Sequence, residues 1–355
     1  MKRGTKRVTI RDVAARAGVS PSTAHLVVAG KAGPKEETRQ QVLRVAEELN
    51  YQCNAAASSL KRGETWIGAV LPAPEGGNEL YYTPIWEGVR ASCESAQDFN
   101  IPLLELPYRK DGAVTVRMDS VEELWAEDKL SGVVMLGDIA PEARKALRNL
   151  SDRGLPIVLV NGEVPEIGPV CSVQTENYVL GRTMGEILVR AASGGGGILV
   201  CAGGESTPAN VETVQGLESY LREKAPERAI HKIYYGYSDE EIERLYTRLL
   251  ETFRTEEIGG CCSVTARGSI QLAQALEQTG MAGRVPAIGS DIFLHNIDSL
   301  KRDVFQNLLF KDPYQQGWQA AKRLFQYIFR ANQAKGEILK LKGEVVFQSS
   351  ISMYG

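Results

Sequence analysis

The stretch 8-VTIRDVAARAGVSPSTAHLVV carries two helix starts with a helix stop between them. Thr9 opens a capping box, and apolar residues follow at helical spacing until Gly18 ends the pattern. Ser20-Pro21 is a second start signal, because serine caps a helix and proline is tolerated at its first position. We therefore predict two helices joined by a short turn, the second over residues 21–29, as in a helix-turn-helix unit.

A third helix is predicted over residues 35–49, because four apolar residues lie on one face of that stretch: Val42, Val45, Ala46 and Leu49. This face would close a small core with the first two helices. We expect a small all-α head over 1–53, a hinge and linker over 54–64, and a larger core over 65–355.

The charge of the chain is distributed unevenly. Residues 1–64 hold 12 Lys and Arg against 6 Asp and Glu, whereas the whole chain has a net charge of -3. The segment 1–64, which comprises the head with its hinge and linker, is therefore at +6 and the remainder at -9. A basic head on an acidic body favours a nucleic-acid-binding module joined to a module of another kind.

Composition excludes several classes of protein. With 355 residues, 43% hydrophobic and 24% charged, the chain is typical of a globular protein of two or three domains. It has no apolar run long enough for a membrane span, and its basic start lacks the apolar region of a secretory signal. The six cysteines make no CxxC pair, so we expect reduced thiols in a cytoplasmic protein, with Cys261 and Cys262 buried and inert.

The body alternates apolar runs with amphipathic stretches. The runs are 66-WIGAVLP, 101-IPLLEL, 132-GVVMLG, 156-PIVLVN, 198-ILVCAG, 258-IGGCCSV and 285-VPAIGSD. Predicted helices begin near residues 85, 142, 178, 211, 239, 269 and 313. This pattern predicts an α/β core of two doubly wound parallel-sheet subdomains, with a cleft at the carboxyl ends of the strands where a ligand binds.

The opening stretch, followed by 38-TRQQVLRVAEELNYQCNAAASSL, resembles the DNA-binding head and hinge of the lactose-repressor (LacI) family of bacterial transcription regulators. The rest of the chain is similar to the periplasmic-binding-protein-like core of that family, so the resemblance covers nearly the whole length. It implies a homodimeric regulator, acting as a repressor, that binds a pseudo-palindromic DNA operator and senses a sugar or sugar derivative.

The resemblance also implies roles for residues of the head. Base-reading positions are Pro21, Ser22, His25 and Leu26, and phosphate-contacting positions are Thr9, Ser20, Thr23, Thr38, Arg39 and Asn54. The family usually has Ser-Arg where this chain has His25-Leu26. Leucine cannot make the bidentate contact of arginine with guanine, so an unusual operator is expected. The alternative for Leu26 is packing into the core of the head.

The segment 54-NAAASSL resembles the family's hinge helix, which orders when two copies meet on DNA. Ala57 and Leu60 would enter the minor groove, with Leu60 as the wedge between base steps; an ordinary linker leucine is the alternative. Cys53 and Ser58 replace the usual proline and arginine of this hinge.

The family's ligand-contacting positions carry mostly unusual residues. Their counterparts in this chain are Asn161, Thr213, Thr265, Arg267, Asp291 and Lys311. Arg267 and Lys311 would favour an anionic ligand such as a sugar phosphate or sugar acid, unless they are merely surface cations.

No pattern of residues supports catalysis, a metal site or a cofactor. The glycine run 194–197 precedes its strand, and Gly203-Gly204 lacks phosphate-loop spacing, so neither predicts nucleotide binding. We therefore expect no enzyme. The competing hypothesis is a ligand-binding protein with a degenerate, nonspecific DNA-binding head, which a competition experiment with bulk DNA would distinguish.

Overall fold

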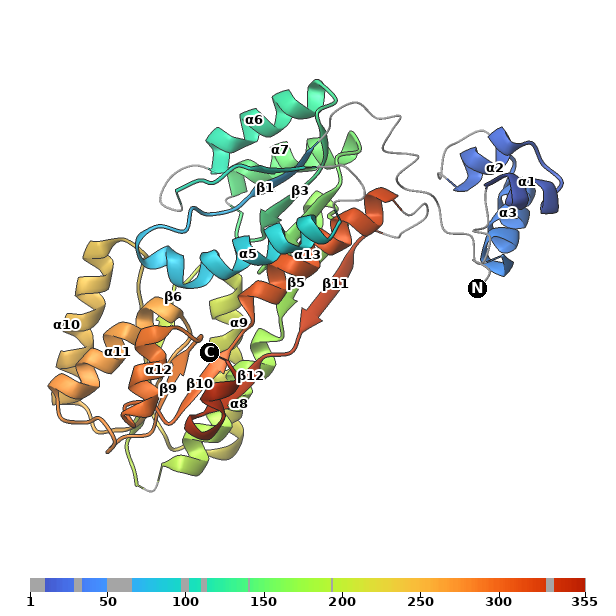
Figure 1. The fold of residues 1–355 in the computed structure, drawn as a ribbon. Coiled ribbons are helices and arrows are strands. Elements are labelled where there is room, and N and C mark those ends of the chain that lie inside the picture. The colour runs from blue at the N-terminus through green and yellow to red at the C-terminus, as the bar shows by residue number, and fades with distance from the viewer. Residues whose placement is uncertain are drawn as a thin grey trace, which may run out of the picture.

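The three-dimensional structure is a computed structural model, and it describes residues 10–28, 34–49, 66–96, 102–109, 114–139, 141–192, 194–329 and 335–354. Figure 1 shows a small helical head and a larger body in which helices surround two sheets. Within these ranges, no helix is both long and apolar enough to cross a membrane.

Three helices form the head: α1 (Ile10–Arg16), α2 (Pro21–Val28) and α3 (Glu36–Glu48). Gly18 has φ +65°, the left-handed conformation that ends a helix, and the backbone N–H of Thr23 donates to Ser20 Oγ at 3.0 Å. Val13, Val27 and Val42 are fully buried in the core that the helices share. The predicted helix-turn-helix with a third closing helix is therefore confirmed for the described residues.

The first subdomain contains a parallel sheet of strand order β11-β5-β4-β3-β1-β2. Its strands are β1 (Trp66–Val70), β2 (Leu103–Glu105), β3 (Leu130–Leu136), β4 (Ile157–Val160), β5 (Cys171–Thr175) and β11 (Glu337–Leu341). Helices α5 (Glu79–Ser95) and α13 (Pro313–Phe329) cover one face, whereas α6 (Val114–Ala126) and α7 (Pro141–Asp152) cover the other. Adjacent residues of β3 point to opposite cores, which explains its continuous apolar sequence.

The second subdomain repeats this architecture with the strand order β12-β10-β9-β8-β6-β7, in which only β12 is antiparallel. Its strands are β6 (Gly197–Gly203), β7 (Ile230–Tyr234), β8 (Ile258–Ser263), β9 (Ala287–Ser290), β10 (Asn307–Phe310) and β12 (Glu344–Phe347). Helices α8 (Asn177–Ala191) and α9 (Pro208–Lys224) cover one face. The other face packs on α10 (Asp239–Thr255), α11 (Ala266–Gln278), α12 (Leu294–Lys301) and the 3-10 helix η4 (Gln348–Met353).

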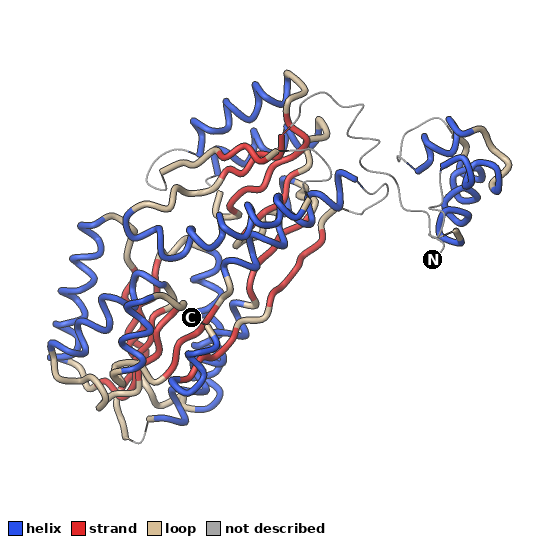
Figure 2. Tube along the Cα trace, viewed as in Figure 1, coloured by secondary structure: helices blue, strands red, loops and turns tan. Residues whose placement is uncertain are grey.

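The chain crosses between the two sheets three times: after β5, after β10 and after β11. Figure 2 shows these crossings as short loops at the waist of the body. Thr175 Oγ1 donates to the carbonyl oxygen of Lys311 at 2.9 Å, and the N–H of Glu176 donates to that of Leu341 at 2.9 Å. The crossing after β5 is thus hydrogen-bonded to each of the other two crossings. The predicted pair of doubly wound subdomains is confirmed.

Each subdomain contains a pair of helices that meet through glycines. A methyl group on Gly88 of α5 would overlap the carbonyl oxygen of Tyr314, and one on Gly317 of α13 would overlap that of Ile85. The pair α8 and α9 repeats this contact, because Gly181 lies against Thr213 and Gly216 against Tyr178. Helix axes can approach this closely only where a side chain is absent.

The five described cysteines are all buried and free. Burial raises the pKa of Cys93 to about 12 and that of Cys171 to about 12. Burial also raises the pKa of Cys201, Cys261 and Cys262 well above that of a free thiol. The expected inertness of Cys261 and Cys262 agrees with this burial.

Replacement of Gly216 by alanine should lower the free energy of unfolding by about 1–3 kcal/mol, because overpacking at a backbone contact outweighs the better helix propensity of alanine. Urea unfolding followed by circular dichroism measures this loss. Gly194→Ala is the matched control, since no atom lies within 4 Å of its added methyl, and it should change stability by less than about 0.5 kcal/mol. Equal stabilities of the two variants would contradict the close helix contact.

The cysteines should be unreactive in the folded protein. A free thiol becomes a thiolate over about pH 7 to 9. The raised pKa values keep the described thiols protonated over this range. A thiol-specific chromogenic reagent should therefore modify at most one of the six cysteines rapidly in the native chain, and all six in urea. Rapid native modification of two or more would contradict the burial.

Candidate nucleic-acid interface and ligand cleft

Helix α2 of the head begins with exposed residues. Pro21 and Ser22 are exposed at the N-terminus of α2, and Leu26 is half-buried and does not belong to the apolar core of the head. The alternative in which Leu26 packs into that core is therefore not supported. The side chain of His25 lies outside the described part of the chain, as do Thr9, Asn54, Ala57 and Leu60.

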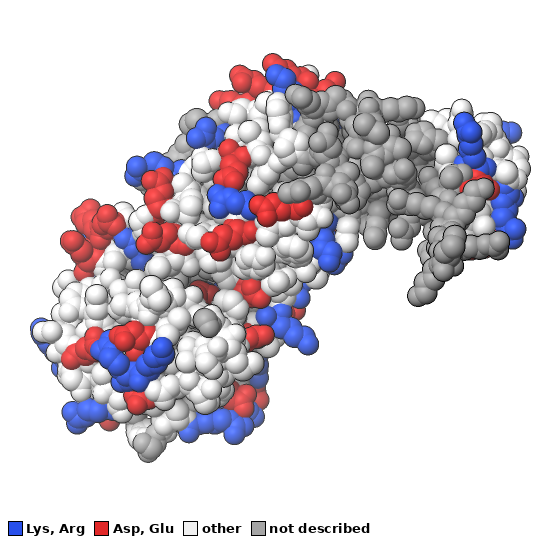
Figure 3. Space-filling model, in the orientation of Figure 1, with Lys and Arg blue, Asp and Glu red and all other residues white. Residues whose placement is uncertain are grey.

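Several predicted phosphate contacts make local bonds in the head. Ser20 Oγ lies 2.8 Å from Thr23 Oγ1 and accepts the N–H of Thr23, so this serine has a structural role as the cap of α2. Thr38 and Arg39 are half-buried in the first turns of α3, where Arg39 Nε lies 3.9 Å from Glu36 Oε2. On the face drawn in Figure 3, basic side chains predominate on the described part of the head, whereas acidic and basic side chains are interspersed over the body.

The cleft between the subdomains contains two cavities that share part of their lining. The larger, which we call the outer chamber, has a volume of about 1040 Å³. The smaller, the inner chamber, has a volume of about 70 Å³ and lies beside the chain crossings. Gly77, Asn78, Thr207, Tyr237 and Arg267 line both. Because the lining loops follow parallel strands, the cleft lies at the carboxyl ends of both sheets.

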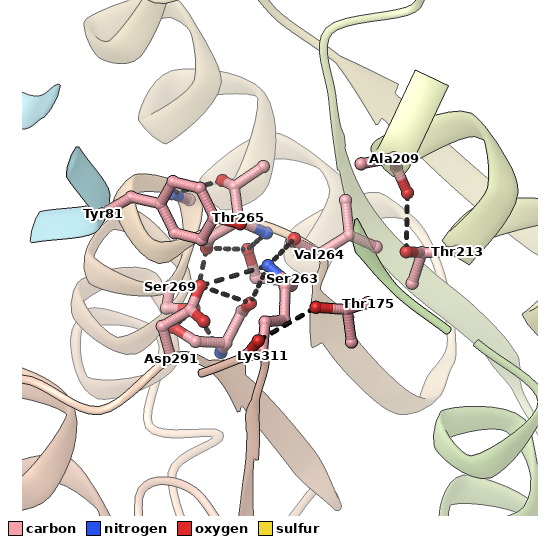
Figure 4. A network of polar contacts seen from close by, with 12 residues as sticks. Tyr81, Thr175, Ala209, Thr213, Ser263, Val264, Thr265, Ser269, Asp291 and Lys311 are labelled. Carbon is pink, nitrogen blue, oxygen red and sulfur yellow. Dashed lines mark hydrogen bonds and ion pairs between the residues drawn. The ribbon is translucent and has the colours of Figure 1, made fainter. Parts of the chain in front are cut away.

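The inner chamber is built around a buried ion pair. Lys311 Nζ lies 3.1 Å from Asp291 Oδ2, and these side chains are only 11% and 3% exposed. The ammonium also donates to the carbonyl oxygen of Val264 at 2.9 Å and to Ser290 Oγ at 2.8 Å, as Figure 4 shows in part. It lies 5.6 Å from the ring centre of Tyr81. All three hydrogens of the ammonium therefore have acceptors, which compensates for its burial.

Tyr81 and Gln316 complete this network. Gln316 is fully buried, and its Nε2 donates to the carbonyl oxygen of Lys311 at 3.0 Å and to Thr175 Oγ1 at 3.1 Å. Its amide also bonds the hydroxyl of Tyr81, at 3.0 Å. Burial, followed by the nearby charge of Asp291, raises the pKa of Tyr81 well above its usual range, so this tyrosine stays neutral. Sequence reasoning missed both residues.

Five of the six predicted ligand-contacting residues line the inner chamber: Asn161, Thr265, Arg267, Asp291 and Lys311. Asn161 and Asp291 have φ values of +57° and +67°, directly after β4 and β9. Thr265 caps α11, since its Oγ1 accepts the N–H of Gly268 at 3.0 Å. Thr213 is different: it lines neither chamber, and its hydroxyl donates to Ala209 O within α9 at 2.8 Å (Figure 4). This bond argues against a ligand contact.

Arg267 does not present a free positive charge. Its guanidinium donates to the carbonyl oxygen of Tyr237 and forms an ion pair with Asp239, while its side chain lies against Gly77 of the first subdomain. The expectation of an anionic ligand rested on Arg267 and Lys311. Since both cations are paired with carboxylates inside the cleft, the structure removes the basis for that expectation. Among the described residues, no cluster of His, Cys, Asp and Glu could hold a metal ion.

The fold and cleft define a two-subdomain ligand-binding core attached to a helix-turn-helix head. The sequence model of the family "Periplasmic binding protein domain" matches residues 69–331, and that of "Bacterial regulatory proteins, lacI family" matches residues 9–54. The chain therefore belongs to the lacI family of bacterial regulatory proteins and carries a periplasmic-binding-protein domain.

Relatives of known name agree with this assignment. The HTH-type transcriptional regulator MalR of Streptococcus pneumoniae is 27% identical over 52% of this chain and 54% of its own, so the match spans about half of that relative. Catabolite control protein A of Staphylococcus xylosus is 26% identical over 77% of this chain and 78% of its own. Among solved structures, an ABC transporter solute-binding protein of Burkholderia graminis with D-arabinose has a TM-score of 0.72, at 16% identity over 83% of this chain and 99% of its own. That likeness shows the fold.

Replacement of Lys311 by methionine should lower the free energy of unfolding by about 3–5 kcal/mol, because it leaves the buried carboxylate of Asp291 without its countercharge. Lys340→Met is the matched control: Lys340 pairs with Glu176 at 3.5 Å, and both side chains are exposed by more than a third. An exposed pair contributes at most about 1 kcal/mol. Denaturant unfolding compares the two variants, and similar losses would contradict the role of the buried pair.

Proposed function

We propose that this protein is a sequence-specific DNA-binding transcription regulator, acting as a repressor, whose DNA affinity is set by a small molecule in the cleft. One observation carries the proposal: a helix-turn-helix head with a capped, solvent-facing α2 is joined in one chain to a core with a ligand-sized cleft. Among the named relatives, MalR is a transcriptional regulator, which supports the same class. The effector we propose is a sugar or sugar derivative.

On the DNA side, the N-terminal residues of α2 would enter the major groove. Pro21, Ser22, His25 and Leu26 would face base edges there, with Leu26 suited to contact a thymine methyl group. The phosphate contacts would come from Thr9, Ser20, Thr23, Thr38, Arg39 and Asn54. Ala57 and Leu60 of the hinge would contact the minor groove, where Leu60 would separate two base steps.

Two copies of the chain would act together. A homodimer imposes its twofold symmetry on the operator, so two heads would read the halves of a pseudo-palindrome. Such a regulator would work in the bacterial cytoplasm, where it meets DNA. The ligand would act by favouring one arrangement of the subdomains, and the three bonded crossings between them support a hinge at that point.

Two serines of the head should respond differently to alanine replacement. Ser20→Ala removes the cap of α2 and should weaken binding to operator and bulk DNA alike, by about five- to tenfold for a cap worth about 1 kcal/mol. Ser22→Ala leaves the cap intact, so it should change the preference among operator bases with little loss on bulk DNA. Binding of both variants to sequences selected from the genome by the native protein measures these effects.

The same selection tests the proposal as a whole. A regulator should prefer its selected sequence over bulk DNA by about a thousandfold or more. A preference below about tenfold would instead favour a ligand-binding protein with a nonspecific head. A footprint that protects only one half-site at saturation would contradict the homodimer on a pseudo-palindrome.

A further inference from the structure

The inner chamber lies at the place where a doubly wound sheet usually binds its ligand, yet it has little room. Asn161, Asp291 and Lys311 line it, and each directly follows a strand. Small-molecule pockets usually measure about 300–1,000 Å³, whereas this cavity measures about 70 Å³. An ordinary small-molecule ligand therefore does not fit beside the side chains that line it.

The side chain of Lys311 takes up both the space and the hydrogen-bond acceptors at this place. Its ammonium donates to Val264 O at 2.9 Å, to Ser290 Oγ at 2.8 Å and to Asp291 Oδ2 at 3.1 Å (Figure 4). These acceptors lie at the ends of β8 and β9, in the second subdomain. The ring of Tyr81, on α5 of the first subdomain, has its centre 5.6 Å from the same nitrogen. The ammonium thus has partners in both subdomains, as a ligand of the cleft would have.

Other polar side chains of the lining bond to groups of the chain itself. Asn210 Nδ2 donates to the hydroxyl of Tyr237 at 2.9 Å, and Thr265 Oγ1 lies 2.5 Å from the hydroxyl of Tyr235. The guanidinium of Arg267 donates to the carbonyl oxygen of Tyr237. A ligand site needs polar groups that converge on the ligand and are free to bond it. Most polar groups around the inner chamber are instead already bonded within the chain.

The carboxylate of Asp291 depends on this ammonium. Its side chain is only 3% exposed, and Lys311 Nζ, 3.1 Å from its Oδ2, supplies the countercharge. A buried carboxylate that loses its countercharge destabilises a protein strongly, because water cannot replace the lost partner. If the lysine side chain were shortened, the space left behind would therefore favour another cation that carries N–H donors.

We propose that Lys311 is a built-in ligand of the core, which holds the acceptors of the inner chamber against any free molecule. When its side chain is shortened, the same acceptors bind a small primary alkylammonium ion in its place. Lys311 is thus the residue that determines what the inner chamber accepts. This role belongs to the core alone and does not depend on DNA binding by the head. A small molecule that acts in the cleft must use groups outside the inner chamber.

Complementation of a shortened side chain tests this role. In Lys311→Ala, n-propylammonium carries the same carbons and nitrogen that the substitution removes. Urea unfolding of the full-length protein, followed by circular dichroism, is measured with increasing n-propylammonium chloride and with sodium chloride at equal concentration. The ammonium ion should raise the unfolding midpoint of Lys311→Ala and leave that of the native protein unchanged, because a ligand of the folded state stabilises it by mass action. The apparent affinity should be at least about tenfold higher for the variant.

Two control variants and a neutral probe separate this effect from a general one. Lys311→Met loses the same charge but fills most of the space, so it should be destabilised without responding to the ion. Lys340→Ala removes a lysine whose side chain is 42% exposed, and it should not respond either. On Lys311→Ala, n-propanol should bind at least about tenfold more weakly than n-propylammonium, because it lacks the charge. Equal responses of the alanine and methionine variants, or none from the alanine variant, would overturn the proposal.

A further pair of measurements covers the case in which Lys311→Ala does not fold alone. Added n-propylammonium should then restore its folded circular dichroism spectrum, and a chain that stays unfolded would contradict the role of Lys311. The double variant Lys311→Ala with Asp291→Asn has no unpaired buried charge, so it should fold without the ion. It should also show no preference for n-propylammonium over n-propanol. A preference retained in the double variant would place the binding elsewhere and overturn the proposal.

Discussion

Lys311 links the chain crossings to the strand ends of the second subdomain, because both its carbonyl oxygen and its ammonium are hydrogen-bonded. Its carbonyl oxygen accepts Thr175 Oγ1 at 2.9 Å and Gln316 Nε2 at 3.0 Å, which ties two chain crossings together. Its ammonium is held by Val264, Ser290 and Asp291 at the strand ends of the second sheet. Rotation of one subdomain about the crossings must therefore shift a residue that is fixed to the floor of the cleft. The chain crossings, where a hinge would lie, are thus linked through Lys311 to the residues that line the inner chamber.

Most strands that sequence patterns identified are buried on both faces, such as β3 and β6, where apolar residues run without interruption, and the edge strand β2 is the exception. Five strands were not predicted: β5, β7, β10, β11 and β12. The strands β7, β11 and β12 lie at sheet edges and carry charged residues, so their periodicity is weak. β5 contains Gln174 and Thr175, which are polar but buried because they lead into the first crossing. Helices α6 and α12 were missed as well; both are short or weakly amphipathic.

The resemblance to the LacI family supplied the candidate residues of the cleft, but it did not supply Tyr81 and Gln316, which lie on helices. Asn161 and Asp291 follow strands directly and take a positive φ that asparagine and aspartate tolerate, so position in the sequence already places them at the cleft. Tyr81 lies on α5 and Gln316 on α13, and the sequence does not show which side of each helix is turned toward the cleft. Which face meets the crossings depends on the glycine contact between these helices, and periodicity alone does not reveal it. The ion pair of Arg267 with Asp239 joins residues on two different helices, so the periodicity of the sequence did not reveal it either.

A ligand changes DNA binding only through its different affinities for two arrangements of the subdomains. The groups around Lys311 lie mainly in the second subdomain, so they are satisfied whether or not the first subdomain approaches. The outer chamber is different, because Asp138 faces Thr207 across the cleft through a single 3.4 Å bond that contributes little to closure. Couplings between sites are typically about 1–3 kcal/mol, which is within reach of a few charge-assisted bonds. The balance between arrangements is therefore most sensitive where weakly bonded groups of the two subdomains, such as Asp138 and Thr207, face one another.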